Sequence, residues 1–352
     1  MQLCIRDGLK NATHVSKLLA KCQSLAKFSH KSSKMADLLE QMNAKIARMN
    51  VTRWNSEFML IRSIASIGKT DLDVITSVME NPVKFSNNDL TILDEIIEVL
   101  QPFYEISIKC QAESAVTASM VVPSIAHLIS HLRDIRAEIV FCAKLAQQLE
   151  TSIHVRFAGI TDRLYEIEPT GDSPFSDPLY FIASVLDPQF KFHWVRDLKR
   201  PVQSENRLKQ DIIQLIIDEG KNDSKQCSIK TIEKSACSSS CADTPKAKRR
   251  KLFHYDHDIV GDATETTVLD PAIELDSYLN DPIRTSFSQY WSHSPLNILK
   301  KIVQRVFSVQ ASSAPIERVF SHAGLILSSR RTNLSEQLFR DLVFLRVNQS
   351  LL

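Results

Sequence analysis

Apolar side chains recur at helical spacing from Leu3 to about Ile217. The clearest case is a stripe on one face of a predicted helix, formed by Leu90, Leu93, Ile96, Ile97, Leu100 and Phe103. Ser86, with Asp89 three residues later, resembles a capping box at its start, and Pro102 predicts a kink or an end. Similar stripes run through residues 15–25, 121–135 and 145–164. The pattern predicts an all-helical domain over residues 1–217.

Residues 114–132 contain no Asp, Glu, Lys or Arg and resemble a membrane span at first sight. The same segment holds several Ser and Thr residues together with Pro123, His127 and His131. These side chains would be poorly placed against lipid. We therefore expect a buried helix of a soluble bundle here, and no membrane association.

The amino-acid composition changes between Asp218 and Asp262, where Lys and Ser are frequent and apolar side chains are few. Such a segment cannot bury enough surface to offset its ordering entropy, which predicts a disordered linker over residues 218–262. Its basic cluster, Lys248, Arg249, Arg250 and Lys251, is typical of a nuclear localisation signal or of a nonspecific phosphate contact. The alternative is an ordinary solvated run of charges.

The linker contains a possible zinc-finger ligand set, Cys237, Cys241, His254 and His257. Twelve residues separate the second cysteine from the first histidine, as in many zinc fingers. The His-x-x-His spacing is shorter than fingers normally use, and Ser and Lys occupy the places of the small apolar core. We therefore expect a chance arrangement within the linker and no metal site.

Two well-delimited helices are predicted in the remaining region, residues 263–352. Ser313 can cap the first, with Pro315 in its first turn, and Gly324 is placed to end it. Ser335 can cap the second. Their apolar faces consist of Ile316, Phe320 and Ala323 in the first helix, and of Leu338, Leu342 and Leu345 in the second. A residual strand near residues 307–309 is the one departure expected from a mainly α fold.

The amino-acid composition excludes few classes of protein. With 43% hydrophobic and 24% charged residues, the 352-residue chain resembles an ordinary globular protein. Only 7 glycines are present, which disfavours glycine-rich nucleotide-binding loops. A net charge of +2 argues neither for nor against nucleic acid, because only clustered charge creates a useful field. The first ten residues, MQLCIRDGLK, lack the features of a secretory leader. Together with the seven cysteines, this favours reduced thiols in the cytosol or nucleus.

The segment SSAPIERVFSHAGLILSSRRTNLSEQLFRDLVFLRVN, residues 312–348, resembles the C-terminal signature of hAT-superfamily transposases. ELDSYL at 274–279 and the Tyr290–Trp291 pair before Pro295 look like the same family's lead-in. Three further blocks follow the family's order: TRWNSEFMLIR at 52–62, LQPFYEISIKCQAESAVTASMVVPSI at 100–125 and ASVLDPQFKF at 183–192. The resemblance therefore extends over nearly the whole chain.

This resemblance implies a cut-and-paste transposase whose RNase H-like core is interrupted by a long helical insertion. Three acidic side chains of that core hold the metal ions that cut DNA, and Glu317 matches the third. Trp54, beside Arg53, matches a tryptophan that stacks near a flipped base. The C-terminal segment is the family's dimerisation region, which implies a dimer contact at Phe320, Leu338, Leu342 and Leu345.

The family places two catalytic aspartates and a Cys-x-x-His motif ahead of the stretch that here reads MQLCIRDGLKN, and a BED-type zinc finger further upstream. We therefore expect an incomplete Mg²⁺ or Mn²⁺ site, no resident cofactor and no strand cleavage by this chain. Both matched residues also have a purely structural interpretation. Glu317 is also an acid favoured in the first turn of a helix, and Trp54 is also a tryptophan suited to a helical core.

The expected protein is nuclear and non-catalytic, with a helical insertion domain and the C-terminal fragment of an RNase H-like core. Its partner is expected to be a second copy or a related transposase-like protein, with DNA as a further partner. Two alternatives remain open. One is a truncated piece of an active transposase, and the other is a helical protein-interaction scaffold with no nucleic-acid role.

Overall fold

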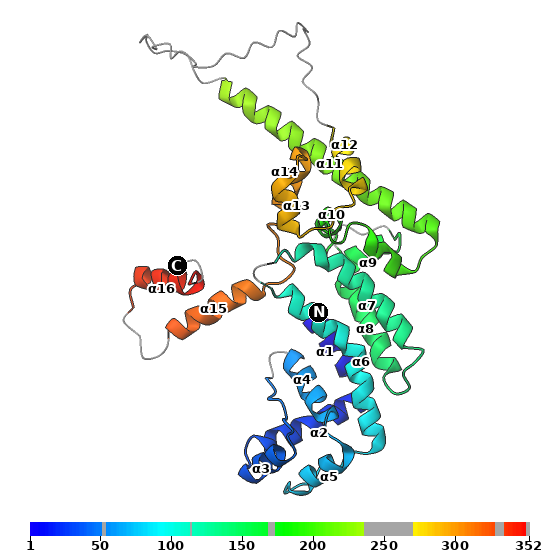
Figure 1. Ribbon diagram of the computed structural model, residues 1–352, viewed down its shortest axis with the longest axis vertical. Coiled ribbons are helices and arrows are strands. Elements are labelled where there is room, and N and C mark those ends of the chain that lie inside the picture. Colours follow the sequence, from blue (N-terminus) through cyan, green and yellow to red (C-terminus); the bar gives the residue numbers. More distant parts are fainter. Residues whose placement is uncertain (51–53, 113–114, 168–172, 236–269, 328–333, 350–352) are drawn as a thin grey trace.

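The regular apolar spacing produces helices throughout the N-terminal part of the chain (Figure 1). The structure, a computed structural model, describes residues 1–50, 54–112, 115–167, 173–235, 270–327 and 334–349. The first helices are α1 (Gln2–Asn11), α2 (Thr13–Ser29), α3 (Ser33–Gln41), α4 (Trp54–Ala65), α5 (Lys69–Ser77), α6 (Asn87–Cys110), α7 (Val121–Ile135), α8 (Ala143–Arg156), α9 (Ala158–Leu164) and α10 (Leu179–Leu186). Short 3-10 turns lie at Ala118–Met120 and His193–Leu198. One contiguous apolar core runs through the body from Cys4 to Val306.

Helix α6 lies along the middle of this body (Figure 1) and begins as its sequence predicts. The Ser86 hydroxyl accepts from the Asp89 N–H, and the Asp89 carboxylate accepts from the Ser86 N–H, which confirms the capping box. The helix does not end at Pro102 but continues to Cys110. Proline has no N–H and leaves the Glu98 carbonyl without its usual helical partner. The Glu98 carbonyl instead lies beside the ring of His131, on α7. Burial lowers the pKa of His131, and its hydrogen bond with the Glu98 carbonyl opposes this lowering.

A buried carboxylate joins α6 to the start of α8. Glu95 is 8% exposed and accepts hydrogen bonds from the backbone N–H groups of Val140 (2.9 Å), Phe141 (2.8 Å) and Cys142 (2.7 Å). These N–H groups precede or begin α8, so the carboxylate satisfies donors that a helix start leaves free. The contact fixes the two helices against each other.

The uncharged segment around residues 114–132 is part of the core. Helix α7 buries Val122, Ile125, Leu128, Ile129 and Leu132. The prediction of a buried helix is therefore confirmed. Among the described helices, none is both long enough and apolar enough to cross a membrane.

The structure differs from two sequence-based predictions. Helix α11 runs from Val202 to Ser235, so helical structure continues 18 residues past the predicted end at 217. The rest of the predicted linker, residues 236–262, lies outside the described residues. The strand expected near residues 307–309 is absent, because α14 (Asn297–Val306) ends there in a turn, and the described residues contain no strand to pair with.

The C-terminal region has two parts (Figure 1). Helices α12 (Pro271–Asn280), α13 (Phe287–His293) and α14 lie against α10 and α11. Helices α15 (Ala314–Ile326) and α16 (Glu336–Val347) instead form a hairpin that extends away from the body. Ser335 caps α16 as predicted, accepting from the Leu338 N–H. Gly324 does not end α15, which continues for two more residues.

Candidate interaction site

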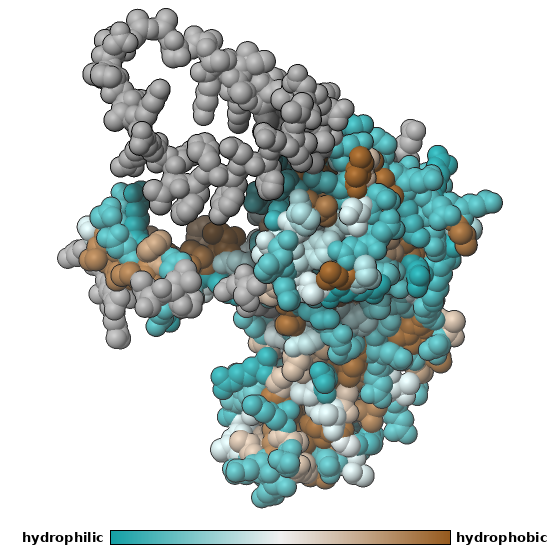
Figure 2. Space-filling view, turned by 45° about the horizontal axis from the view of Figure 1, so that its top comes forward, coloured by the Kyte–Doolittle hydropathy of each residue, from teal (hydrophilic) through white to brown (hydrophobic). Residues whose placement is uncertain are grey.

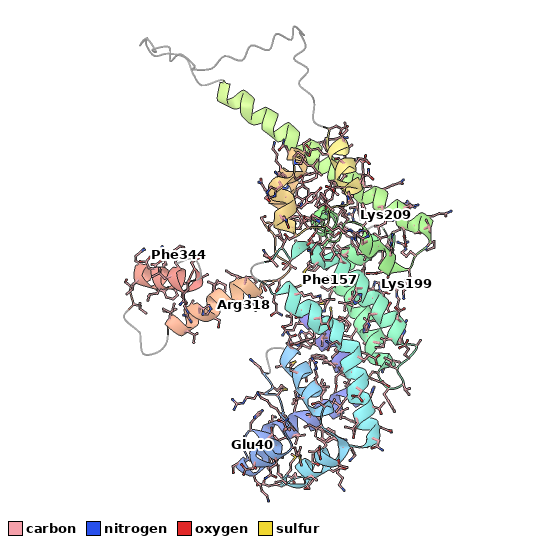
Figure 3. All side chains as sticks on the ribbon, in the orientation of Figure 1. Glu40, Phe157, Lys199, Lys209, Arg318 and Phe344 are labelled. Carbon is pink, nitrogen blue, oxygen red and sulfur yellow. The ribbon has the colours of Figure 1, made fainter. Side chains whose placement is uncertain are left out.

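The hairpin of α15 and α16 leaves its apolar side chains uncovered. Neither helix contains a buried residue, although the two helices contact each other. Apolar side chains gather on the hairpin at the left of Figure 2, and Phe344 lies far from the body in Figure 3. Between residues 314 and 347, the large apolar residues that are at least 41% exposed are Ile316, Phe320, Leu325, Leu327, Leu338, Phe344, Leu345 and Val347. Such a concentration of exposed apolar surface marks an interaction site.

Helices α12 and α13, in contrast, are fastened to the body by buried aromatic side chains. Tyr278 is fully buried, and its hydroxyl donates to the Val185 carbonyl at 3.0 Å. Its ring stacks on that of Trp291, with 5.3 Å between centroids. The Trp291 indole N–H donates to the Leu186 carbonyl at 3.0 Å. Both acceptors belong to α10, so the end of this helix is the anchor point.

Lys191 strengthens the same anchor. Its ammonium donates to the Tyr278 carbonyl at 2.7 Å and to the Asp281 carbonyl, and it lies 4.7 Å from the centre of the Tyr278 ring. The side chain therefore caps the end of α12, where helical carbonyls lack partners. Burial lowers the pKa of Lys191. The nearby Asp187 carboxylate accepts from the Ser119 hydroxyl at 2.6 Å, which ties the segment to the turn before α7.

Helix α14 is positioned by a second buried carboxylate. Glu274 of α12 is 8% exposed, and its Oε2 accepts from the backbone N–H groups of Ile298 (2.9 Å) and Leu299 (3.0 Å). These are the first residues of α14, so the negative charge meets the positive end of the helix dipole. The interaction holds α12 and α14 together as one unit.

The base of the hairpin is also held in place. Thr117 is fully buried; its hydroxyl donates to Oε1 of Gln310 at 2.7 Å and accepts from the Ala311 N–H at 2.9 Å. One turn into α15, the Arg318 guanidinium donates to the Gln111 carbonyl at 2.8 Å. These contacts fix the start of α15 against the connection between α6 and α7.

A groove of about 740 Å³ lies between the body and the base of the hairpin. Trp54 and Met59 of α4, Tyr104 and Ile108 of α6, and Glu317 of α15 are among its lining residues. Three of the four sequence blocks that resemble the transposase family thus contribute walls to one cavity. The fourth, residues 183–192, instead holds α12 and α13.

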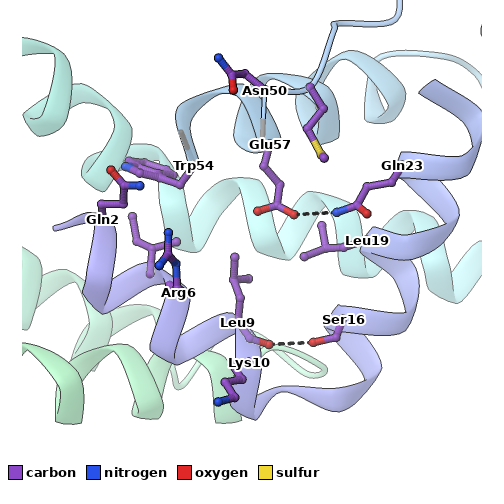
Figure 4. A pocket seen from close by; sticks show the side chains of 12 residues that line it. Gln2, Arg6, Leu9, Lys10, Ser16, Leu19, Gln23, Asn50, Trp54 and Glu57 are labelled. Atoms are coloured by element: carbon purple, nitrogen blue, oxygen red, sulfur yellow. Dashed lines mark hydrogen bonds between the residues drawn. The ribbon is translucent and has the colours of Figure 1, made fainter. Parts of the chain in front are cut away.

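A smaller hollow of about 350 Å³ adjoins the groove and shares Trp54 with it (Figure 4). Arg6 and Lys10 of α1 line it on one side, and Glu57 of α4 lies across from them. Burial raises the pKa of Glu57, whose carboxylate accepts from Gln23 at 3.2 Å. The Trp54 ring is half-buried, with its centroid 6.1 Å from that of Phe58 and 6.4 Å from that of Tyr104. One tryptophan therefore forms part of both cavities.

The rim of the groove includes an aromatic residue on a constrained loop. Phe175 has a φ of 63°, in the left-handed region that a bulky residue rarely adopts, and its side chain is 42% exposed. Gly159 allows the loop to approach α9, because a Cβ there would lie 2.4 Å from the Ser176 nitrogen. The Gly159 N–H donates to the Pro174 carbonyl at 2.9 Å, and the Phe175 ring lies 5.0 Å from that of Phe157.

Comparison with known families identifies the C-terminal region. Residues 274–348 match the hAT family C-terminal dimerisation region. The chain therefore contains a hAT-type dimerisation region. A search of curated proteins gave no match. The hAT dimerisation region includes α13 to α16 and most of α12, so it contains both the anchored helices and the exposed hairpin.

The predicted dimer residues all lie on the hairpin of the hAT dimerisation region. Phe320, Leu338 and Leu345 are 69%, 49% and 47% exposed, whereas Leu342 is half-buried. Three of the four therefore have surface available for a partner. Leu325, at 72%, is more exposed than all four of these residues, and Phe344, at 66%, is more exposed than all but Phe320.

The two residues matched to the catalytic machinery of the family lie on one groove. Glu317 is exposed, and its carboxylate accepts from the Ser313 hydroxyl at 2.7 Å. Within the described residues, no three His, Cys, Asp or Glu side chains converge as metal ligands. Arg53 and the cluster from Lys248 to Lys251 lie outside the described residues, as do the four Cys and His residues of the linker.

Proposed function

We propose that this protein is a transposase-derived, non-catalytic interaction protein that dimerises through the α15–α16 hairpin of its hAT dimerisation region. The observation that carries the proposal is that neither hairpin helix has a buried residue, although both display large apolar side chains. A second copy, or a related transposase-like chain, would cover this surface. The hairpin and α14 would then represent the end of an RNase H-like core.

DNA is the proposed second partner, in keeping with a nuclear protein. The support is the smaller hollow, where Trp54 lies with the cationic side chains of Arg6 and Lys10. Cations can contact phosphates, and an aromatic face can stack on a base. Binding that weakens as salt concentration rises would support this part of the proposal, and absence of binding at low salt would favour the protein-interaction scaffold instead.

The non-catalytic part of the proposal rests on chemistry. Glu317 is the single residue that matches a metal ligand of the family, and one carboxylate cannot position two metal ions. Incubation of the purified protein with a DNA substrate in Mg²⁺ or Mn²⁺ tests this directly. Nicking that disappears in Glu317→Gln would overturn it.

The shared groove of Trp54 and Glu317 favours a second candidate function, a portion of an active cut-and-paste transposase. In that case, two further metal-ligating carboxylates would come from outside residues 1–352. Sequencing the coding region upstream of the Met1 codon distinguishes the two candidates. An in-frame core that carries two aspartates and a Cys-x-x-His motif would favour the second.

Sedimentation velocity at micromolar concentration tests dimerisation. We expect a dimer for the unaltered chain and a roughly tenfold loss of affinity for Phe320→Asp, because a charge would enter an apolar contact. Ile273→Asp is a matched control, since Ile273 and Phe320 are both 69% exposed but Ile273 lies on α12. A strictly monomeric protein, or equal effects of the two substitutions, would contradict the proposal.

A further inference from the structure

The chain displays a second uncovered apolar surface besides the hairpin. Three large apolar side chains at the groove remain partly exposed: Met59 at 38%, Ile108 at 49% and Phe175 at 42%. They come from α4, α6 and the loop before α10, which lie far apart in the sequence. The groove therefore has apolar side chains on α4, α6 and its rim, and polar side chains such as Glu317 and Arg318 at the base of the hairpin, with a volume large enough for several side chains.

The hairpin of the same chain does not fill this groove. Residues 311–314, Glu317 and Arg318 form part of its wall, but no residue of α16 lines it. The contacts of Thr117 with Gln310 and of Arg318 with Gln111 fix the direction in which α15 leaves the body. Figures 1 and 3 show α15 carrying α16 away from α4 and α6. The apolar end of the hairpin and the apolar groove thus remain separate within one copy.

We propose that a second copy of the chain brings these two surfaces together. The exposed side of α16, with Phe344 and Leu345, occupies the groove of the partner, and the partner's α16 occupies the groove of the first copy. This arrangement rests on the proposed dimerisation and specifies its geometry. An exchange of the same element in both directions closes with two-fold symmetry, as in domain-swapped dimers. It covers two apolar surfaces that would otherwise both face water.

Two features of the structure support this occupant. The groove is continuous with the hAT dimerisation region, because the first turn of α15 belongs to both. Phe175 is held in a strained backbone conformation that keeps an aromatic ring at the rim, and strain of this kind persists where the surroundings enforce it at a functional surface.

Complementation between two variants tests the arrangement. Phe344→Asp alters the hairpin, and Ile108→Asp alters the groove; both side chains are exposed, so the body should fold normally. We expect each variant alone to dimerise roughly tenfold more weakly than the unaltered protein. A mixture should regain a heterodimer, because one intact hairpin can still enter one intact groove. Val202→Asp, on α11 and 69% exposed, serves as a control that should leave association unchanged.

The outcomes are distinguishable. If Ile108→Asp dimerises like the unaltered chain, or if the mixture stays monomeric, the reciprocal exchange is wrong while dimerisation itself stands. If the unaltered chain is monomeric, the proposed function fails as well.

Cross-linking gives a second readout that does not depend on weakened association. Ile108→Cys in one tagged chain and Leu345→Cys in another should join through a short thiol-reactive linker. A mixture without Ile108→Cys controls for the native cysteines. No cross-link above that control would overturn the exchange.

Discussion

The two parts of the hAT dimerisation region, α12–α14 and α15–α16, differ in what covers their apolar side chains. The first part buries Leu275, Tyr278, Leu299 and Ile302 against the body, and buried Lys191 and Glu274 satisfy its helix ends. The second part has no buried residue in either helix. The hAT dimerisation region therefore consists of an anchor, α12–α14, and an arm, α15–α16. The proposed dimer contact lies on the arm, whereas the anchor fixes the arm to the body.

The difference follows from the distribution of apolar residues. In α14, Ile298, Leu299, Ile302, Val303 and Val306 are all buried, and the helix contacts α10, α11 and α12. In α16, apolar residues cover more than one face. Phe339, Leu342 and Val343 are half-buried, but Leu338, Phe344 and Leu345 stay exposed. One neighbouring helix cannot cover two faces, so part of the apolar surface of α16 stays exposed.

The largest expected effect concerns the anchor. Tyr278→Ala should lower the free energy of unfolding by about 3–5 kcal/mol, because it removes a fully buried ring and the hydrogen bond to Val185. Phe344→Ala, on the arm, should change the stability of the monomer by less than about 0.5 kcal/mol. Urea denaturation below the dimerisation concentration measures both. Similar losses for the two variants would remove the distinction between anchor and arm.

A smaller effect is expected in the pH dependence of the anchor. Burial raises the pKa of Asp187, which lies at the end of α10 and whose carboxylate accepts from the Ser119 hydroxyl. The folded state therefore favours the protonated acid. The stability that this group contributes is full below its unfolded pKa of about 3.9 and is lost as the pH rises through the raised folded pKa.

Asp187→Asn should remove this dependence while keeping an oxygen that can accept a hydrogen bond. Relative to the unaltered chain, the variant should gain stability as the pH rises from 4 to 7, because asparagine does not ionise. Denaturation curves at several pH values provide the measurement. A variant that loses stability as the pH rises would show that ionised Asp187 strengthens the anchor.

Much of the helical body could be predicted from the sequence, because local signals determine it. The Ser86–Asp89 capping box and the apolar stripe after it produce α6 as expected. The failures have non-local causes. Helix α6 continues past Pro102 because both of its flanks pack in the core, and α11 continues past residue 217 although its apolar spacing weakens there.

The interaction site was predictable only in part. Family resemblance identified Trp54, Glu317 and the hairpin residues, but sequence spacing alone does not reveal that Trp54 and Glu317 line one groove. Lys191 and Thr117 were missed as positioning residues, because their roles depend on carbonyl and amide groups roughly 90 to 190 residues away. The lead-in motif that contains Tyr278 and Trp291 was the sequence signal for the anchor. Nothing in this motif indicates that the two side chains donate hydrogen bonds to carbonyls of α10.

The smallest expected effect lies within the arm. Gly324 was expected to end α15, but it lies inside the helix, and a Cβ there would meet no atom within 4 Å. Gly324→Ala should therefore stabilise α15 by about 0.5–1 kcal/mol, since alanine loses less backbone entropy in a helix. Amide hydrogen exchange should slow across α15 and stay unchanged across α12–α14. If the substitution instead weakens dimerisation, the open space at Gly324 is where the partner's backbone approaches the arm, and the interface extends along α15 as well as α16.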